Sequence, residues 1–169
     1  MLGHTDTPAM TADCPQIAAR VATLPIARIV ASDLTRASAQ AAVLAERRRV
    51  PLTLDLAWRE LDFGEWDGHA PGDLPAPALA AFWNDPEAQA PPGGERWSDL
   101  CARVVGALDR LESDTLVVTH AGAIRAALAV LTGLDHRGVW ALDLPYRALL
   151  SLRIWPGTRL TGHVTDLVT

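Results

Sequence analysis

The sequence predicts a single α/β domain, and two observations lead to that prediction. Short apolar runs rich in β-branched residues alternate along the chain with Ala-rich segments of helical periodicity. The length of 169 residues fits one domain, residues 1–169, and 49% of them are hydrophobic, which is enough to cover one core. We therefore expect strands and helices arranged in layers around a single sheet.

The N-terminal half is predicted to contain strands and one long helix. His4 follows Met1–Gly3, which resembles the end of a short strand. Residues 27–32 (ARIVAS) are a β-branched apolar run, and the Ala-rich residues 34–49 carry Leu and Val at helical spacing. Residues 52–58 (LTLDLAW) alternate apolar with polar side chains, which predicts a strand with one covered face at the sheet edge.

A loop-rich insert is predicted over residues 62–94, with a helix only around residues 78–84. Long inserts in compact domains are usually lids or binding loops, so we expect a lid here. The prediction depends on closely spaced glycines and prolines, which are Gly64, Gly68, Pro71, Gly72, Pro75, Pro77, Pro86, Pro91, Pro92, Gly93 and Gly94.

The C-terminal half continues the alternation of helix and strand. Residues 98–111 are predicted to form a helix whose apolar side chains lie on one face. Residues 115–119 (TLVVT) are predicted to form a strand buried on both faces. An Ala-rich helix is predicted over residues 121–131, followed by two closing strands at residues 148–155 and 160–167.

The charge balance excludes several classes of partner. With 15 Lys and Arg against 20 Asp and Glu, the net charge is −5, so the molecule repels nucleic acid and anionic membrane surfaces. Apolar runs are far shorter than the ~20 residues of a spanning helix, and no signal-peptide pattern is visible. We expect a cytoplasmic protein, and the sequence leaves a homodimer open.

Two histidines lie where ligands bind in α/β sheets. His4 and His120 each follow a predicted strand, and the carboxyl ends of parallel strands form the ligand-binding edge. His120 also leads directly into the helix that starts near Ala121, whose free N–H groups favour an anion such as phosphate. Either histidine alone is better explained by a structural bond to a carbonyl, but their matched positions favour a site.

Arg36 and Glu60 are the other candidates for chemistry. Arg36 lies in the first turn of its predicted helix, where the helix dipole is unfavourable for a cation, but where a guanidinium can bind phosphate oxygens. A solvated surface arginine explains the position equally well. Glu60 starts a run of carboxylates among aromatic residues, where a raised pKa would make it a proton donor. The alternatives are an acidic surface turn or a cation site. The spacing matches no calcium loop, so we predict no metal site.

Together these segments resemble the histidine phosphatase superfamily, the phosphoglycerate mutase-like proteins. The resemblance implies a three-layer α/β/α sandwich with a mostly parallel central sheet, no metal or organic cofactor, and a small phosphate ester as substrate. It rests on five segments in the family's order, which are His4-Thr5-Asp6-Thr7-Pro8, Ser32-Asp33-Leu34-Thr35-Arg36-Ala37, Glu60 to Gly68, Gly93 to Ser98, and Val117 to Arg125.

The resemblance also implies roles for individual residues. His4 would be the nucleophile that becomes phosphorylated, Arg36 and His120 would hold the phosphoryl group, and Glu60 would protonate the leaving oxygen. Thr5 and Ala121, which directly follow the two histidines, are expected to contact the substrate. Trp66, Phe82 and Trp83 of the insert can stack on a planar base, although aromatic residues in a lid more often form its core; we take Trp66 as the candidate substrate contact.

Within the superfamily the motifs are most similar to those of alpha-ribazole phosphatases of cobalamin biosynthesis. We therefore predict a phosphomonoesterase with a phosphohistidine intermediate, and alpha-ribazole phosphate as the candidate substrate. Gly3 replaces the arginine that precedes the nucleophilic histidine in the family. Two alternatives follow, namely a phosphate-binding pseudo-enzyme of the same fold and a phosphoglycerate-type mutase.

Overall fold

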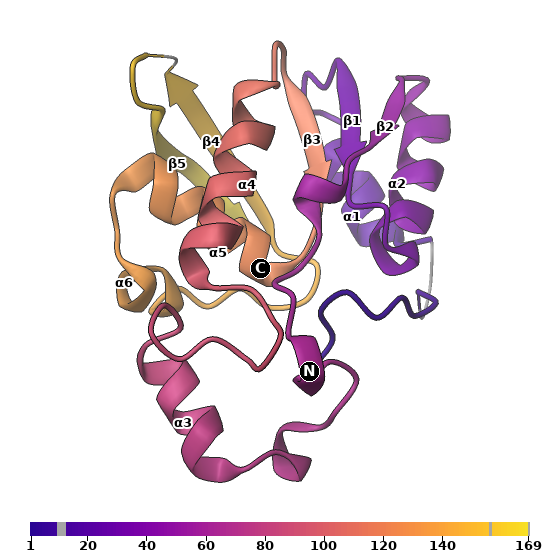
Figure 1. Cartoon of the computed structure of the whole chain (residues 1–169). Coiled ribbons are helices and arrows are strands. Elements are labelled where there is room, and N and C mark those ends of the chain that lie inside the picture. Colours follow the sequence, from indigo (N-terminus) through magenta and orange to yellow (C-terminus); the bar gives the residue numbers. More distant parts are fainter. Residues whose placement is uncertain (10–12, 156, 169) are drawn as a thin grey trace.

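The central sheet is parallel and lies between two layers of helices (Figure 1). The computed structural model describes residues 1–9, 13–155 and 157–168. β1 (Arg28–Ala31) pairs with β2 (Leu52–Leu54) on one side and with β3 (Thr115–Val118) on the other, in the order β2-β1-β3. The α/β sandwich and the parallel central sheet are therefore confirmed.

Alternate side chains of β1 build two cores on opposite faces of the sheet. Ile29 and Ala31 pack against α1 (Pro15–Val21) and α2 (Thr35–Arg48). Val30, between them in sequence, belongs to the core that α4 (Trp97–Asp109) and α5 (Ala121–Thr132) form on the other face. This alternation is the period of two that a strand covered on both faces requires.

The C-terminal strands form a separate antiparallel pair. β4 (Leu149–Trp155) pairs with β5 (Thr161–Val168), and leucines of β4 pack on α5 and on α6 (His136–Trp140). Within the described ranges, this pair shares no ladder with the three-stranded sheet.

The insert packs around its own aromatic residues. Its helix α3 (Ala76–Asn84) places the fully buried Phe82 edge-on against Phe63 and Trp66, with ring centroids 6.1 and 5.8 Å apart. The remainder of residues 62–94 consists of loops and two short 3₁₀ turns, Gly64–Trp66 and Pro71–Asp73. Trp66 is thus part of the core of the insert.

Most predicted elements are confirmed, including the edge position of the strand at residues 52–54, but that strand is shorter than predicted. Asp55 ends it, because its carboxylate accepts a hydrogen bond from the Ala57 N–H and caps the 3₁₀ turn Leu56–Trp58. β3 is covered on both faces, since Val117 packs into one core and Leu116 and Val118 into the other, but its side chains are only half-buried. The short helices α1 and α6 were not predicted.

The strand predicted before His4 is absent, and residues 1–9 contain neither strand nor helix. The main chain there bonds to other partners: the Gly3 N–H donates to Asp67, and the Leu2 and Gly3 carbonyls accept from Arg36. None of the described helices has the length and apolar character needed to cross a membrane.

Candidate active site

His4 is held by the main chain of Glu60. Its Nε2 lies 3.0 Å from the Glu60 carbonyl oxygen, and because a carbonyl only accepts, Nε2 carries the proton. Its Nδ1 lies 3.5 Å from a carboxylate oxygen of Asp62. A ring anchored through Nε2 leaves Nδ1 as the nitrogen that can attack when it carries no proton.

Two side chains from distant segments fix the loop that carries His4. Asp67 of the insert accepts hydrogen bonds from the N–H groups of Gly3 (2.7 Å) and Thr5 (2.6 Å). Arg36, in the first turn of α2, donates to the carbonyls of Gly3 (2.5 Å), Thr5 (2.9 Å) and Leu2 (3.4 Å). Arg36 is therefore beside His4, and its three hydrogen bonds position the loop of His4.

Gly3 occupies a place with no room for a side chain. A Cβ atom there would lie 2.6 Å from the Leu61 carbonyl oxygen and 2.9 Å from the Phe63 nitrogen. Both are main-chain atoms, which cannot turn aside as a side chain can. With the backbone in this conformation, the arginine expected from the resemblance does not fit.

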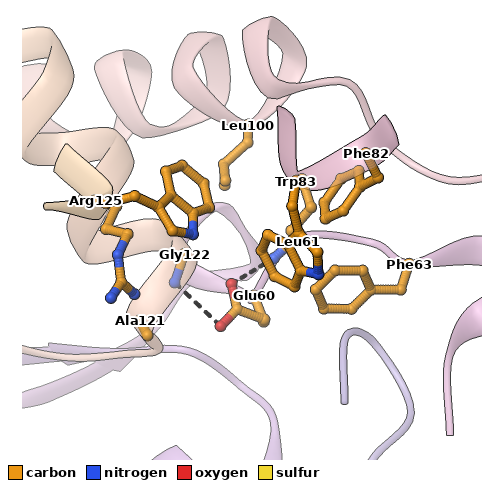
Figure 2. A pocket seen from close by; sticks show the side chains of 10 residues that line it. Glu60, Leu61, Phe63, Phe82, Trp83, Leu100, Ala121, Gly122 and Arg125 are labelled. Atoms are coloured by element: carbon orange, nitrogen blue, oxygen red, sulfur yellow. Dashed lines mark hydrogen bonds between the residues drawn. The ribbon is translucent and has the colours of Figure 1, made fainter. Parts of the chain in front are cut away.

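Glu60 has the environment of a proton donor (Figure 2). One carboxyl oxygen accepts a hydrogen bond from the Leu61 N–H at 2.8 Å, and the other accepts one from the Gly122 N–H at 3.1 Å. Removal from solvent raises the pKa of Glu60, despite these hydrogen bonds and the charges of Arg36 and Arg103. A carboxyl that keeps its proton to higher pH can deliver it to a leaving group.

His120 lies at the N-terminus of α5, directly after β3. Its Nε2 is buried and has no hydrogen-bond partner among the described residues. Burial, aided by the charges of Arg36 and Arg103, lowers the pKa of His120 to about 3, so the ring is neutral at pH 7. Since buried polar atoms are nearly always paired, this nitrogen is suited to a ligand oxygen.

Arg103 of α4 supports the loop before Glu60, and the sequence analysis did not predict this. Its guanidinium donates to the carbonyls of Ala57 (2.9 Å), Arg59 (2.8 Å) and Glu60 (2.8 Å), and pairs with Glu95 at 2.7 Å. It thus fixes the carbonyl that anchors His4. A single cation within the apolar spacing of this helix was the signal that could have indicated it.

A cavity of about 130 Å³ opens beside the Glu60 carboxyl. Glu60 and the start of α5 form one wall, aromatic residues of the insert form another, and Arg125 and Trp140 complete it. Of the site residues predicted from the sequence, Glu60 and Ala121 line this cavity, whereas His4, Thr5, Arg36, Trp66 and His120 do not. In the described ranges, no group of three or more His, Cys, Asp or Glu side chains is arranged to hold a metal ion.

The structure thus brings together residues that are far apart in sequence. His4 contacts Glu60, the Glu60 carboxyl contacts Gly122 two residues after His120, and Arg36 holds the loop of His4. Thr5 lies in that loop with its main chain bonded at both ends. The cluster combines an anchored histidine, a buried carboxyl with a raised pKa and a buried imidazole nitrogen without a partner among the described residues, groups that phosphoryl transfer can use.

Comparison with known proteins agrees with this chemistry. The sequence profile described as "Histidine phosphatase superfamily (branch 1)" matches residues 9–166. The chain is 34% identical over 150 residues to the glucosyl-3-phosphoglycerate phosphatase of Mycobacterium tuberculosis H37Rv, covering 80% of this chain and 64% of that protein. It is 29% identical over 124 residues to the adenosylcobalamin/alpha-ribazole phosphatase of Salmonella typhimurium LT2, covering 69% and 61%.

Solved structures resemble the whole described fold. YhfR of Bacillus stearothermophilus superposes with a TM-score of 0.84 at 26% identity, covering 98% of this chain and 86% of the other. The mycobacterial glucosyl-3-phosphoglycerate phosphatase in complex with inorganic phosphate superposes with a TM-score of 0.81 at 27% identity, covering 98% and 89%. The chain spans 53% to 64% of the length of the glucosyl-3-phosphoglycerate phosphatases that it matches in sequence. The matched profile begins after His4.

Proposed function

Because the chain belongs to the histidine phosphatase superfamily (branch 1), we propose that it is a phosphomonoesterase that acts through a phosphohistidine intermediate. The observation that carries the proposal is the double role of Glu60. Its carbonyl anchors His4, while its carboxyl, with a raised pKa, bonds to the Gly122 N–H beside the unpaired His120. Nucleophile, acid and anion site therefore meet at one residue.

The first half-reaction forms the intermediate. The unprotonated nitrogen of His4 attacks phosphorus, the ester P–O bond breaks, and the Glu60 carboxyl gives its proton to the departing alcohol oxygen. The His120 ring and the N–H groups at the start of α5 face the charge on the phosphoryl oxygens. Asp62, now beside Nδ1 of His4, has to turn away as the anionic ester enters, since like charges repel.

The second half-reaction restores the enzyme. The Glu60 carboxylate takes a proton from water, the oxygen of that water attacks phosphorus, and the bond from phosphorus to His4 breaks. Inorganic phosphate leaves, His4 is neutral again and Glu60 is again protonated. One carboxyl serves both halves, and its raised pKa suits it to give a proton in the first half and to take one in the second.

The substrate is proposed as a class, a small phosphate ester. Alpha-ribazole phosphate is the candidate that the sequence motifs favour, and the name of the mycobacterial relative adds glucosyl-3-phosphoglycerate. The insert of residues 62–94 supplies most of the aromatic side chains at the cavity, so it is the part that selects the leaving alcohol.

The test is phosphate release from p-nitrophenyl phosphate, alpha-ribazole phosphate and glucosyl-3-phosphoglycerate without added metal. We expect His4→Ala to lose at least about 10³-fold in kcat, because the nucleophile itself is removed. His163→Ala is the matched control, since His163 lies on β5 against Trp155 and should leave kcat unchanged. Acid quench of the wild type should trap phosphate on His4. Equal turnover by wild type and His4→Ala would refute the mechanism.

A second function, phosphate binding without turnover, is favoured by one observation. The site lacks the arginine before His4, and Arg36 directs three hydrogen bonds to main-chain carbonyls. In that case vanadate or phosphate would bind to the wild type while no ester is hydrolysed. Vanadate-sensitive turnover that disappears in His4→Ala eliminates this alternative.

A further inference from the structure

A second cavity, of about 140 Å³, lies between the edge of the sheet and the end of α4. Arg28 and Val30 of β1 line it, together with Thr53, which pairs with Val30 in β2. Because side chains alternate along a strand, these three point to the face of the sheet that α4 covers. The opposite wall is formed by Ala107, Arg110 and Leu111.

Trp58 also lines this cavity, and it carries a hydrogen-bond donor that lacks an acceptor. The side chain is 2% exposed, and its indole Nε1 has no hydrogen-bond partner among the described residues. An indole N–H can only donate, and buried polar groups are nearly always paired. An acceptor oxygen on a bound molecule would satisfy this N–H.

The charges around the cavity indicate the charge of its ligand. Arg28 is half-buried and has no hydrogen bond or ion pair within the described ranges. Arg110, in contrast, pairs with Asp55 at 2.6 Å. Burial alone would raise the pKa of Asp55, but the hydrogen bonds from Arg110 and from the Ala57 N–H lower it, so this carboxylate is charged at pH 7. Arg28 therefore matches a ligand with a single negative charge, since a dianion would also be repelled by Asp55.

We propose that this cavity binds a small monocarboxylate with an apolar body, at a site separate from the reaction. The carboxylate accepts from the Arg28 guanidinium, whose parallel N–H donors match its two oxygens, and from the Trp58 indole N–H. The apolar body lies on Val30, Ala107 and Leu111. A cavity of about 150 Å³ holds a benzene-sized molecule, so the volume here suits a body of that size.

The second cavity is distinct from the one at Glu60. In the part of the chain that the structure describes, the two share no lining residue. α4 passes both, since Leu100 lines the cavity at Glu60 and Ala107 lines this one. Seven residues separate them, which is about 10 Å along an α-helix. Binding at the second cavity therefore neither requires the proposed reaction nor blocks it.

The test is isothermal titration of benzoate into the wild type, with benzyl alcohol as the uncharged compound of similar shape. We expect a Kd for benzoate of about 1 mM or lower, and binding of benzyl alcohol that is at least about 10-fold weaker. Arg28→Met should weaken benzoate binding by about 10- to 100-fold, because a charge-assisted pair is lost. Trp58→Phe should weaken it by about 10-fold, because phenylalanine keeps an aromatic ring but has no N–H.

Arg153→Met and Trp155→Phe are the matched controls. Both residues are exposed on β4, outside the cavity, so these variants should bind benzoate as the wild type does. Saturating vanadate should leave the Kd of benzoate unchanged, because an anion at His120 occupies a different place. Thermal unfolding shows whether Trp58→Phe folds, and Arg28→Met, on a half-buried side chain, decides the question if it does not.

Three results would overturn the inference: equal affinity for benzoate and benzyl alcohol, benzoate affinity that Arg28→Met leaves unchanged, or loss of benzoate binding when vanadate is added. Tighter binding of inorganic phosphate than of benzoate, sensitive to Arg28→Met, would overturn the assignment to monocarboxylates. If vanadate does not bind, the proposed function is weakened, and the comparison of wild type with Arg28→Met still decides the second site.

Discussion

Gly122 has to be glycine because the Glu60 carboxyl fills the space where a side chain would begin. A Cβ at residue 122 would lie 1.9 Å from one carboxyl oxygen of Glu60 and 3.0 Å from its carboxyl carbon. The Glu60 side chain is flexible and can move away, whereas the start of α5 is fixed by its helical hydrogen bonds. We therefore predict that Gly122→Ala displaces the proton donor and leaves the fold intact.

The size of the effect follows from the displacement. To reach an ordinary contact of 3.4 Å, the oxygen now 1.9 Å from the Cβ has to move by about 1.5 Å. That movement breaks the bonds from Leu61 (2.8 Å) and Gly122 (3.1 Å) that aim the carboxyl. Misplacement by about 1 Å costs about 10²-fold, and loss of a general acid costs about 10²- to 10⁴-fold. We expect kcat to fall by at least about 10²-fold.

The assay is turnover of p-nitrophenyl phosphate together with thermal unfolding. Gly106→Ala is the matched control, because this glycine also lies in a helix and its Cβ would meet only the Arg110 side chain, at 3.6 Å. It should keep wild-type turnover and gain up to about 1 kcal/mol from helix propensity. A Gly122→Ala protein that folds and retains more than half of wild-type kcat would show that the Glu60 carboxyl is not the proton donor.

Three further predictions concern the supports of the site. Arg103→Met leaves Glu95 unpaired, so urea unfolding should show a free energy of unfolding that is lower by about 3–5 kcal/mol. Adding Glu95→Gln should restore part of that free energy, and no restoration would argue against the ion pair. The pKa of His120, about 3, lies below its usual 6.5, so the unfolded chain binds the extra proton between these values and stability falls as pH drops through this window. His120→Gln should therefore lose less unfolding free energy than wild type between pH 7 and pH 4, and an equal loss would contradict the burial argument. Gly3→Arg should lower Tm without raising kcat, because its Cβ meets the Leu61 carbonyl at 2.6 Å; a gain in kcat would show that the loop can open.

The sequence was sufficient to predict the sheet edge that carries His120. β-branched runs and Ala-rich helices have clear periods, and a strand that ends directly before a helix N-terminus places His120 and Ala121 unambiguously. Arg36 is likewise found in the first turn of α2, as predicted. These positions follow from local sequence patterns, so they could be predicted without a structure.

The parts that were missed depend on contacts between distant segments. Arg103 and Arg125 lie on helices whose spacing predicts only which face is buried, and their partners come from other elements of the chain. The strand before His4 was predicted from position alone, yet the main chain of Gly3 bonds to Asp67 of the insert and to Arg36 of α2. No local pattern records such a bond, so the prediction was wrong there.

The way the N-terminal loop is held couples His4 to the insert. His4 is not placed by a strand ladder; its loop is fixed by Asp67, which belongs to the same insert that supplies Phe63 and Trp83 to the cavity. A leaving alcohol that shifts the insert must therefore also shift the hydrogen bonds to residues 3 and 5. On the proposed mechanism, substrate selection by the insert should act on kcat as well as on binding, because the segment that lines the cavity also holds the loop of His4.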